Sequence, residues 1–532
     1  MQRDPKRLGR RLLLGAAASL PMVRLARGAV AHRLTLLHVN DFHARHEPVD
    51  GGALACRPDQ GRGGCFGGSP RLATAIALAR TAARSAGRSV ALLDAGDQFQ
   101  GSLFYTAWKG EVERAVMHAI GTEVMAVGNH EFDNGPATLA AFVRGARFAV
   151  VSANLQVDDS DLAGLLRPWI ILEKDGLRIG VVGLTTPETA TSSSPGPRVR
   201  FLPPGPALTR AAAEARAAGA RIVLALSHLG VGADRALAGR VPGVDVFLGG
   251  HSHTLLSDTE PGAAGPAHAV LDGPAGPAVV LQAGAYGRHL GRLDLDVAAD
   301  GTVLAYGGDC RHVGLDLPMD PTVAAIVASY AVHLDAVRRR PVGQMAEALS
   351  NATCRIAECP LGNLVADAML ADSPGAEVAV MNAGGLRTGL PGGTVTLGDV
   401  LSVLPFGNTL ATLQLRGTDL RAAIVNGLAR AGTGAFPQVA GLRITWNPLA
   451  ASPSRLLTLQ VRNADGRYAP LDPDRRYRVV TNNFVRAGGD GYLMLRDNAI
   501  DPYDTGPPLD DAVSRAIAAA LAPGIDERIG LR

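Results

Sequence analysis

The chain contains 532 residues, of which 47% are hydrophobic and 19% are charged, and its formal net charge is +3 at pH 7. This composition is typical of a folded globular protein and excludes a disordered chain. Because 532 residues exceed what one hydrophobic core usually organises, we expect two or three domains. The 64 glycines and 34 prolines predict many loops between short helices and strands.

The first 31 residues have the pattern of a secretory signal. The pair Arg10-Arg11 precedes an apolar run over Leu12–Val23, and Ala29-Val30-Ala31 resembles a small-residue cleavage site. The paired arginines favour a signal of the twin-arginine type. An N-terminal membrane anchor is the alternative, but Arg24 interrupts the run before about 20 apolar residues are reached.

Without residues 1–31 the chain carries 45 basic and 48 acidic residues, so the positive charge belongs to the signal. We therefore expect neither a nucleic-acid polymer nor a membrane surface as a partner. The expected location is periplasmic or extracellular, with no membrane span after the signal is cleaved.

The five cysteines fit an exported protein. Cys56 and Cys65 flank a glycine-rich loop, and Cys354 and Cys359 are five residues apart, so two local disulfides are expected. Cys310 is left over and is predicted to be a buried free thiol. No C-x-x-C spacing occurs, which disfavours a cysteine metal site.

Short apolar runs alternate with helical stretches along the first 315 residues, which predicts a layered α/β fold. An alanine-rich helix is expected over residues 72–86. The expected strands cover residues 34–39, 90–93, 124–127, 148–152, 179–184, 222–226 and 246–248.

Polar side chains follow these strands at five points. In an open α/β sheet, ligands bind beyond the carboxyl ends of the strands. Carboxylate, amide and imidazole groups without thiolates suit two divalent ions such as Zn, Mn, Fe or Mg. One such loop could be a polar turn with a helix cap, but five placements favour a metal centre. The residues at the five strand ends are Asp41 and His43, Asp97, Asn129 and His130, His228, and His251 and His253.

The motifs DFH, GDxxxG, GNHEFD, SH and GHSH occur in this order. Together they resemble the calcineurin-like metallophosphoesterases, and most closely the 5′-nucleotidase branch, which includes UDP-sugar hydrolases. The resemblance implies a dinuclear centre that Asp97 bridges, and in several relatives a Gln or Asn takes the place of His253. One metal would be completed by Asp41, His43 and His253, and the other by Asn129, His228 and His251. His130, oriented by Asp133, would stabilise the transition state without binding metal.

Residues 316–342 predict a connector, with prolines at its start and a basic run at its end. An exposed linking helix through about Val337 is expected, and a surface helix inside one domain is the alternative. The resulting fold class is α/β. An N-terminal layered αββα metallophosphoesterase domain, residues 32–315, is joined by this linker to a smaller α/β C-terminal domain, residues 343–532.

The C-terminal part carries phenylalanines in glycine-rich stretches, LPFGNTL and NNFVRAGGDGY, where we expect loops. A flat ring in a loop can stack on a nucleobase, which is worth about 1–3 kcal/mol per base. This part resembles the substrate-binding domain of 5′-nucleotidases. By that resemblance Phe406 and Phe484 would sandwich the base and Asp490 would bind the ribose. Asn382 would touch the base, Asn408 would also contact substrate, and Arg355 and Arg387 would bind phosphate. The Cys354–Cys359 loop would brace Arg355, as in animal members of the family.

The sequence therefore predicts an exported dinuclear-metal 5′-nucleotidase that acts on nucleoside 5′-monophosphates, with UDP-sugars and other nucleotides as further substrates. Metals on one domain and a base clamp on the other imply a site that is complete only when the domains face each other. The alternatives are a periplasmic thiosulfohydrolase of sulfur oxidation, a 2′,3′-cyclic nucleotide phosphodiesterase, and a nucleotide-binding protein with a silent metal site.

Overall fold

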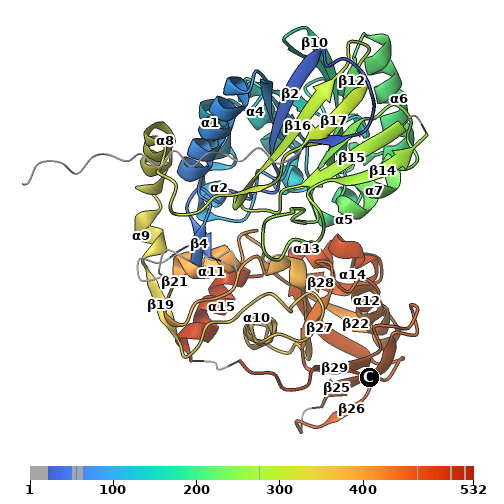
Figure 1. Cartoon of the computed structure of the whole chain (residues 1–532). Coiled ribbons are helices and arrows are strands. Elements are labelled where there is room, and N and C mark those ends of the chain that lie inside the picture. Colours follow the sequence, from blue (N-terminus) through green and yellow to red (C-terminus); the bar gives the residue numbers. More distant parts are fainter. Residues whose placement is uncertain are drawn as a thin grey trace, which may run out of the picture.

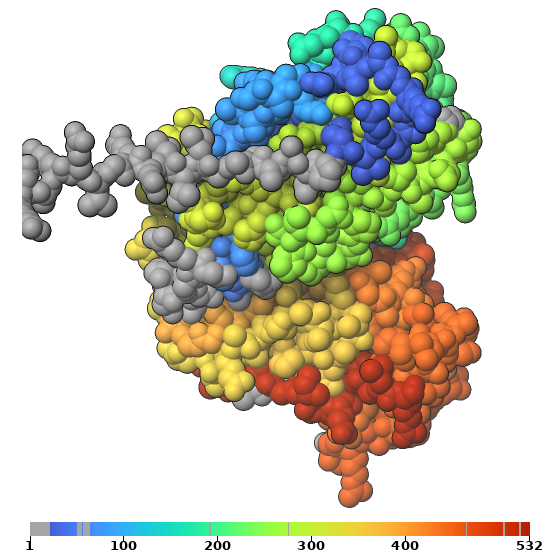
Figure 2. All heavy atoms as spheres, in the orientation of Figure 1, coloured from blue at the N-terminus to red at the C-terminus, as the bar shows by residue number. Residues whose placement is uncertain are grey.

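The computed structural model describes residues 22–50, 56, 64–274, 276–463, 465–503, 506–520 and 523–532. It shows two α/β domains, the N-terminal one above and the C-terminal one below in Figure 1. The space-filling view shows the two domains in contact along their facing sides (Figure 2).

The first sheet of the N-terminal domain has a parallel half and an antiparallel half. Its strand order is β1-β17-β16-β2-β5-β6-β7, and β18 pairs with β16. The parallel strands are β2 (His32–Val39), β5 (Ser89–Asp94), β6 (Val124–Ala126) and β7 (Ala149–Val151). The antiparallel strands are β1 (Val23–Arg24), β16 (His289–Val297), β17 (Val303–Gly307) and β18 (Arg311–His312).

The second sheet has the order β14-β15-β13-β12-β10-β9. Strands β10, β12, β13 and β15 run parallel, and β9 and β14 are antiparallel edges. Their bounds are β9 (Trp169–Lys174), β10 (Leu177–Thr185), β12 (Ile222–His228), β13 (Val246–Gly249), β14 (Ala269–Gly273) and β15 (Gly276–Gln282).

The two sheets pack face to face around one apolar core. Leu36 and Leu93 of the first sheet share this core with Val181 and Leu224 of the second. Helix α1 (Ser69–Ser85) covers the outer face of the first sheet, and α6 (Pro204–Ala217) and α7 (Val231–Ala238) cover the outer face of the second. The predicted αββα layering is therefore confirmed.

Shorter elements complete this domain. The helices are α2 (Leu103–Trp108), α3 (Glu111–Ile120), α4 (Gly135–Gly145), α5 (Thr189–Ser192) and η2 (His130–Phe132). The small strand pairs are β3 (Val49–Asp50) with β4 (Cys65–Phe66), and β8 (Leu155–Val157) with β11 (Val199–Phe201).

All seven predicted strands of this domain are present, with small shifts at their ends. One shift concerns the site, because β12 continues to His228, whereas we expected it to end at Leu226. The parallel neighbours β10 and β13 flank it on both sides and extend its ladder, so that Ser227 lies beside Gly249 and His228 beside Thr185.

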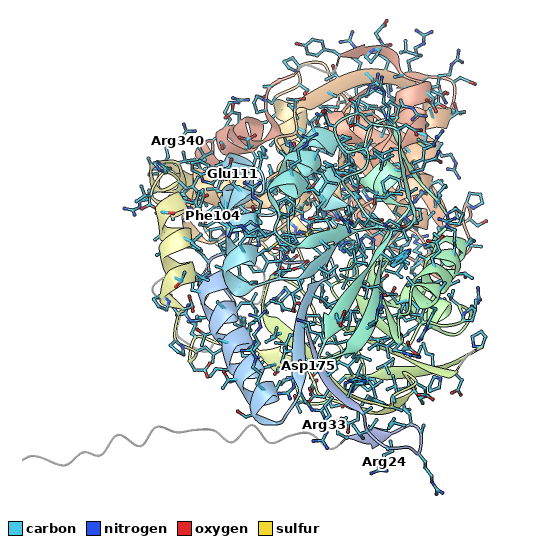
Figure 3. The ribbon with its side chains drawn as sticks, turned by 90° about the horizontal axis from the view of Figure 1, so that it is seen from above. Arg24, Arg33, Phe104, Glu111, Asp175 and Arg340 are labelled. Atoms are coloured by element: carbon cyan, nitrogen blue, oxygen red, sulfur yellow. A yellow bond between two sulfur atoms is a disulfide. The ribbon has the colours of Figure 1, made fainter. Side chains whose placement is uncertain are left out.

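The connector differs from the single exposed helix that the sequence predicts. It forms two helices, α8 (Pro321–Ala331) and α9 (Asp335–Arg338). The side chain of Asp320 caps α8 by accepting a hydrogen bond from Val323 N. One face of α8 is buried against α2 and α3, with Val323 in the same apolar cluster as Phe104. Figure 3 shows Phe104 near these helices and Arg340 at their end.

The C-terminal domain is a second α/β unit with its own core. Its main sheet has the order β23-β20-β27-β22-β28, and a smaller sheet has the order β26-β25-β24-β29. The main strands are β20 (Val378–Asn382), β22 (Leu410–Arg416), β23 (Pro437–Ala440), β27 (Arg476–Asn482) and β28 (Ile500–Tyr503). The others are β24 (Leu442–Trp446), β25 (Leu456–Arg462), β26 (Tyr468–Pro470) and β29 (Ile529–Leu531), and β19 (Pro341–Met345) with β21 (Gly393–Thr396).

Helices surround these sheets and complete the domain. Their bounds are α10 (Pro360–Ala371), η3 (Ala383–Gly385), α11 (Leu397–Val403), α12 (Gly417–Ala429), α13 (Asn483–Arg486), η4 (Gly489–Gly491), α14 (Leu493–Asp497) and α15 (Leu509–Ala518). The predicted α/β class of this part is confirmed.

The cysteines behave as the spacing predicts. Disulfides join Cys56 to Cys65 and Cys354 to Cys359, and Cys310 is free and buried. Residues 1–21 of the predicted signal lie outside the described residues. Residues 22–31 of the predicted signal are described and contain strand β1. Over the described ranges, none of the helices has the length and hydropathy that crossing a bilayer requires.

The packing of α8 gives a testable prediction. Val323 is 2% exposed, whereas Val332, just beyond the same helix, is 69% exposed. We expect Val323→Ala to lower the free energy of unfolding by about 1–3 kcal/mol because it leaves a cavity under α8. Val332→Ala is the matched control and should change it by less than about 0.5 kcal/mol. Denaturant unfolding measures both, and equal effects would contradict the buried position of α8.

Candidate active site

The five polar strand ends meet at one edge of the two sheets that pack face to face. Three of these ends belong to the first sheet, after β2, β5 and β6, and two belong to the second, at β12 and β13. The structure brings their side chains into overlapping clusters of possible ligand atoms, each within 4.8 Å. The clusters are Asp41, His43 and His253; His43, Asp97 and His130; and Asp97, His228 and His251.

The first cluster joins Asp41 and His43 of one sheet to His253 of the other. His253 Nε2 lies 3.4 Å from Asp41 Oδ1 and 3.1 Å from His43 Nε2. His43 donates its Nδ1 hydrogen to the carbonyl oxygen of Phe99 at 3.1 Å, which leaves the Nε2 lone pair facing the cluster. His253 is therefore inside this cluster.

The last cluster has the same design. His228 donates its Nδ1 hydrogen to the carbonyl oxygen of Ala95 at 2.7 Å, so its Nε2 faces Asp97. His251 Nδ1 lies 3.0 Å from Asn129 Oδ1, which brings the amide of Asn129 to the same place.

Asp97 lies between the two groups of ligand atoms. Its Oδ2 is 3.1 Å from His228 Nε2 and 3.7 Å from His43 Nε2. Its other oxygen accepts a hydrogen bond from the backbone N–H of His130 at 2.9 Å. A carboxylate in this position is suited to bridge two ions.

The charges of the site favour cations. Burial alone would raise the pKa values of Asp41 and Asp97, but the histidines around them lower both pKa values. Burial lowers the pKa of His43, so its imidazole is neutral and can act as a ligand. Burial also acts to lower the pKa of His228, yet Asp97 and Asp41 raise it to about 10. This pocket therefore strongly stabilises positive charge next to Asp97.

His130 stands beside the ligand clusters and has its own hydrogen-bond chain. Its Nδ1 lies 2.6 Å from Asp133 Oδ2, and the other oxygen of Asp133 accepts a hydrogen bond from Ser193 Oγ at 2.7 Å. Asp133 therefore fixes the orientation of the imidazole. The ring of His130 lies 5.2 Å from that of His43, measured between centroids.

Glu131 organises the loops of the first sheet, a role that we did not predict. It is fully buried, and its carboxylate accepts hydrogen bonds from four backbone N–H groups. The donors are Asp97 and Gly128 to Oε2, and Gln98 and Phe99 to Oε1. A side chain at Gly128 would collide with Asp97, so these two loops require a glycine there. The motif GNHEFD contains this glutamate, but only the tertiary contacts show that it binds the backbone of two loops.

Two further residues complete the rim without having been predicted. Tyr286 lies against His43 and His253, with ring centroids 5.7 and 5.3 Å away. Glu188 Oε2 lies 3.5 Å from His251 Nε2. Neither residue belongs to a recognisable motif, and each lies far from its partners in the sequence.

The C-terminal domain reaches into this cluster with Arg387. This side chain is 8% exposed, and its Nη2 lies 3.4 Å from His43 Nε2. Its guanidinium stands 5.8 Å from the centre of the Phe406 ring, and that ring is 5.9 Å from the ring of His130. Arg387 and Phe406 therefore lie against the metal-type cluster of the other domain.

The remaining predicted substrate residues lie near one another in the C-terminal domain. Asn382 Nδ2 donates to Asp490 Oδ2 at 2.7 Å, and Asp490 has a left-handed backbone with φ of 54°. Burial lowers the pKa of Arg355, and Arg387 lowers it further while Asp490 acts in the opposite direction, which places Arg355 near both. Asn408 and Phe406 both line one small hollow, which Asn382, Asp490 and Arg355 do not line.

The prediction that Phe484 lies in a loop was wrong. It is in helix α13, because Asn482 caps that helix by accepting a hydrogen bond from Val485 N at 2.8 Å. Its ring packs against Gly489, next to Asp490, and it remains partly exposed. Phe406 lies in a turn, as expected.

The donor set fits divalent metal ions. It combines buried carboxylates with imidazoles whose second nitrogens are engaged, and it contains an amide oxygen. Such an arrangement can hold ions, activate water and stabilise negative charge on a phosphoryl group.

Comparisons with known proteins agree with this geometry. Residues 34–255 match the family model of the calcineurin-like phosphoesterases, and residues 341–497 match that of the 5′-nucleotidase C-terminal domain. The human 5′-nucleotidase is 32% identical over 550 residues, covering 97% of this chain and 94% of that protein. The crystal structure of a 5′-nucleotidase precursor from Thermus thermophilus is 37% identical, with a TM-score of 0.87, and covers 94% of this chain and 99% of that one. A sulfate thiohydrolase from the same organism shares the fold, with a TM-score of 0.75 and 22% sequence identity. The match covers 95% of this chain and 98% of that one.

The role of Glu131 can be tested by Glu131→Gln. The amide keeps the size of the side chain but presents an N–H₂ group to backbone donors, so we expect a loss of about 2–3 kcal/mol in the free energy of unfolding. Metal retention should also fall because the loop of Asp97 loses its support. Glu111→Gln is the control, since Glu111 is exposed. Unchanged stability and metal content in Glu131→Gln would remove this organising role.

Proposed function

Because this chain belongs to the 5′-nucleotidase family of metal-dependent phosphoester hydrolases, we propose that it hydrolyses nucleoside 5′-monophosphates to nucleoside and phosphate at a dinuclear centre. One observation carries this proposal: Arg387 of the C-terminal domain lies 3.4 Å from His43 of the metal-type cluster. An arginine that can bind phosphate therefore lies next to a histidine that can bind metal.

The proposed centre uses the residues of the first and the last of the three clusters, together with Asn129. Divalent ions held there would supply an activated water and neutralise charge on the phosphoryl oxygens. Asp41, His43 and His253 would hold one ion, and Asn129, His228 and His251 would hold the other. Asp97 would be shared between them, which its position between His228 and His43 supports.

His130 and the arginines would serve the phosphoryl group directly. A protonated His130, held by Asp133 at 2.6 Å, can donate a hydrogen bond to an oxygen that gains negative charge in the transition state. The guanidinium fork of Arg387 can bind two phosphate oxygens at once, and Arg355 can add a second positive charge.

The nucleoside would be held by the C-terminal domain. We propose that Phe406 and Phe484 stack on the base, Asn382 and Asn408 contact the substrate, and Asp490 accepts hydrogen bonds from the ribose. The partial exposure of both phenylalanines and the Asn382–Asp490 hydrogen bond support this arrangement. A sulfur-oxidising thiohydrolase would have no use for a base-stacking surface, which disfavours that alternative.

We also propose that the chain is exported. Its two disulfides are typical of proteins that fold in an oxidising compartment. The pattern of residues 1–31 supports a cleaved signal of the twin-arginine type.

A substrate panel tests the proposed function. Phosphate release from AMP, UDP-glucose and a 2′,3′-cyclic nucleotide should be measured side by side with Zn²⁺, Mn²⁺, Fe²⁺ and Mg²⁺. We expect release from AMP that a chelator abolishes and added divalent ion restores. Tight binding of AMP without turnover under any of these ions would instead identify a nucleotide-binding protein.

The role of His130 separates catalysis from metal binding. We expect His130→Ala to lower kcat by about 10²–10⁴-fold because a positioned proton donor is lost, while the metal content stays unchanged. His333→Ala is the control, because His333 is exposed and belongs to none of the ligand clusters. Loss of metal from His130→Ala, measured by elemental analysis, would make His130 a ligand.

The base clamp is tested with two substrates. We expect Phe406→Ala to raise KM for AMP by about 5- to 150-fold, the equivalent of 1–3 kcal/mol of stacking. Its effect on p-nitrophenyl phosphate, which has no nucleobase, should be much smaller. Phe406→Tyr retains the flat ring and serves as the matched control. Equal losses for both substrates would assign Phe406 to the phosphate site.

A further inference from the structure

A second cluster of metal-ligating side chains lies outside the candidate active site. Glu260 lies in the connection between β13 and β14, His289 begins β16, and His312 ends β18. His289 and His312 are direct cross-strand partners, with ring centroids 5.6 Å apart. One ligand atom from each of the three residues lies within 4.8 Å of the others.

The distances in this cluster fit coordination better than hydrogen bonding. Glu260 Oε2 is 3.6 Å from His289 Nε2 and 3.8 Å from His312 Nδ1. Both separations exceed the usual length of a hydrogen bond. Ligand atoms about 2.1 Å from a tetrahedral zinc ion stand about 3.4 Å apart, so a small ion fits between these three groups with little movement.

Hydrogen bonding does not explain the position of the His289 ring. Its side chain is only 13% exposed, and its Nδ1 is buried without a partner among the described residues. Its Nε2 faces Glu260 Oε2 at 3.6 Å, so this nitrogen is presented to the space between the three groups.

The connection that carries Glu260 is held in place by other groups. Glu260 N donates to Ser257 Oγ at 3.0 Å, and Thr259 Oγ1 donates to Asp309 Oδ2 at 2.7 Å. The Glu260 carboxylate is therefore presented to the two histidines by an anchored segment. His312, which is 38% exposed, leaves a path for an ion from solvent.

We propose that Glu260, His289 and His312 form a further metal site, which takes a borderline divalent ion such as Zn²⁺ with water in its open position. Two imidazoles and one carboxylate are a zinc-type ligand set. The ion would tie the segment that follows His253 to the strand that follows Tyr286, and both of these residues line the candidate active site. The site is independent of the proposed function, because it shares no ligand with the dinuclear centre.

The zinc content of the full chain tests this site. His312→Gln and Glu260→Gln remove one ligand each, and His312 is the most exposed of the three, so its replacement disturbs the fold least. After equilibration in a zinc buffer, we expect each variant to hold one zinc ion fewer per chain than the wild type. Zinc should also raise the melting temperature of the variants by less than it raises that of the wild type. His333→Gln, at an exposed histidine, is the matched control and should keep the wild-type content. Equal zinc content in folded variants and wild type would overturn the proposal.

A crystallographic measurement decides the question without variants. Crystals of the wild-type chain grown with zinc should give an anomalous peak about 2.1 Å from Glu260, His289 and His312. A map with peaks only at the dinuclear centre would overturn the proposal and leave the proposed function intact. If AMP hydrolysis fails but the peak is present, the metal site stands and the proposed function falls.

Discussion

Two buried carboxylates, Asp41 and Asp97, set the constraint on which the rest of the N-terminal domain depends. Charges removed from water cost several kcal/mol each unless positive or hydrogen-bonding groups surround them. The structure supplies such groups from both sheets, with His228 and His253 from one and the backbone N–H of His130 from the other. A face-to-face pair of sheets whose strand ends meet is what allows this, because neither sheet alone carries the full set.

The same constraint explains unusual backbone at the site. Asp41, His43, Asp97, His251 and His253 all have positive φ angles, between 51° and 75°. Such angles in residues other than glycine cost of order 1 kcal/mol or more each. These backbone conformations aim the side chains inward. Glu131 stabilises two of the loops through four backbone hydrogen bonds, which offsets part of the strain. Strain is thus concentrated where the chemistry requires directed ligands.

The two domains carry different kinds of functional side chain. The candidate metal ligands lie at strand ends of a doubly layered core, whereas most of the groups suited to recognise a nucleotide lie on the turns and short helices of a separate unit. Arg387 joins the two parts, since it is buried beside His43 although it belongs to the C-terminal domain. The connector supports this arrangement because α8 packs on the N-terminal domain and is not a free spacer.

The sequence by itself determined the strands, their order of appearance and the polar residues that follow them, because apolar runs and motif spacing are local properties. It also indicated both disulfides, since each joins cysteines fewer than ten residues apart. Only the tertiary structure decided that Glu131 supports the loops, that Tyr286 and Glu188 border the cluster and that one face of α8 is buried. The grouping of Glu260, His289 and His312 was likewise invisible in the sequence. These features depend on contacts between residues that are far apart in the chain. Strand pairing and the packing of the layers bring such residues together, and no local sequence pattern encodes either of these.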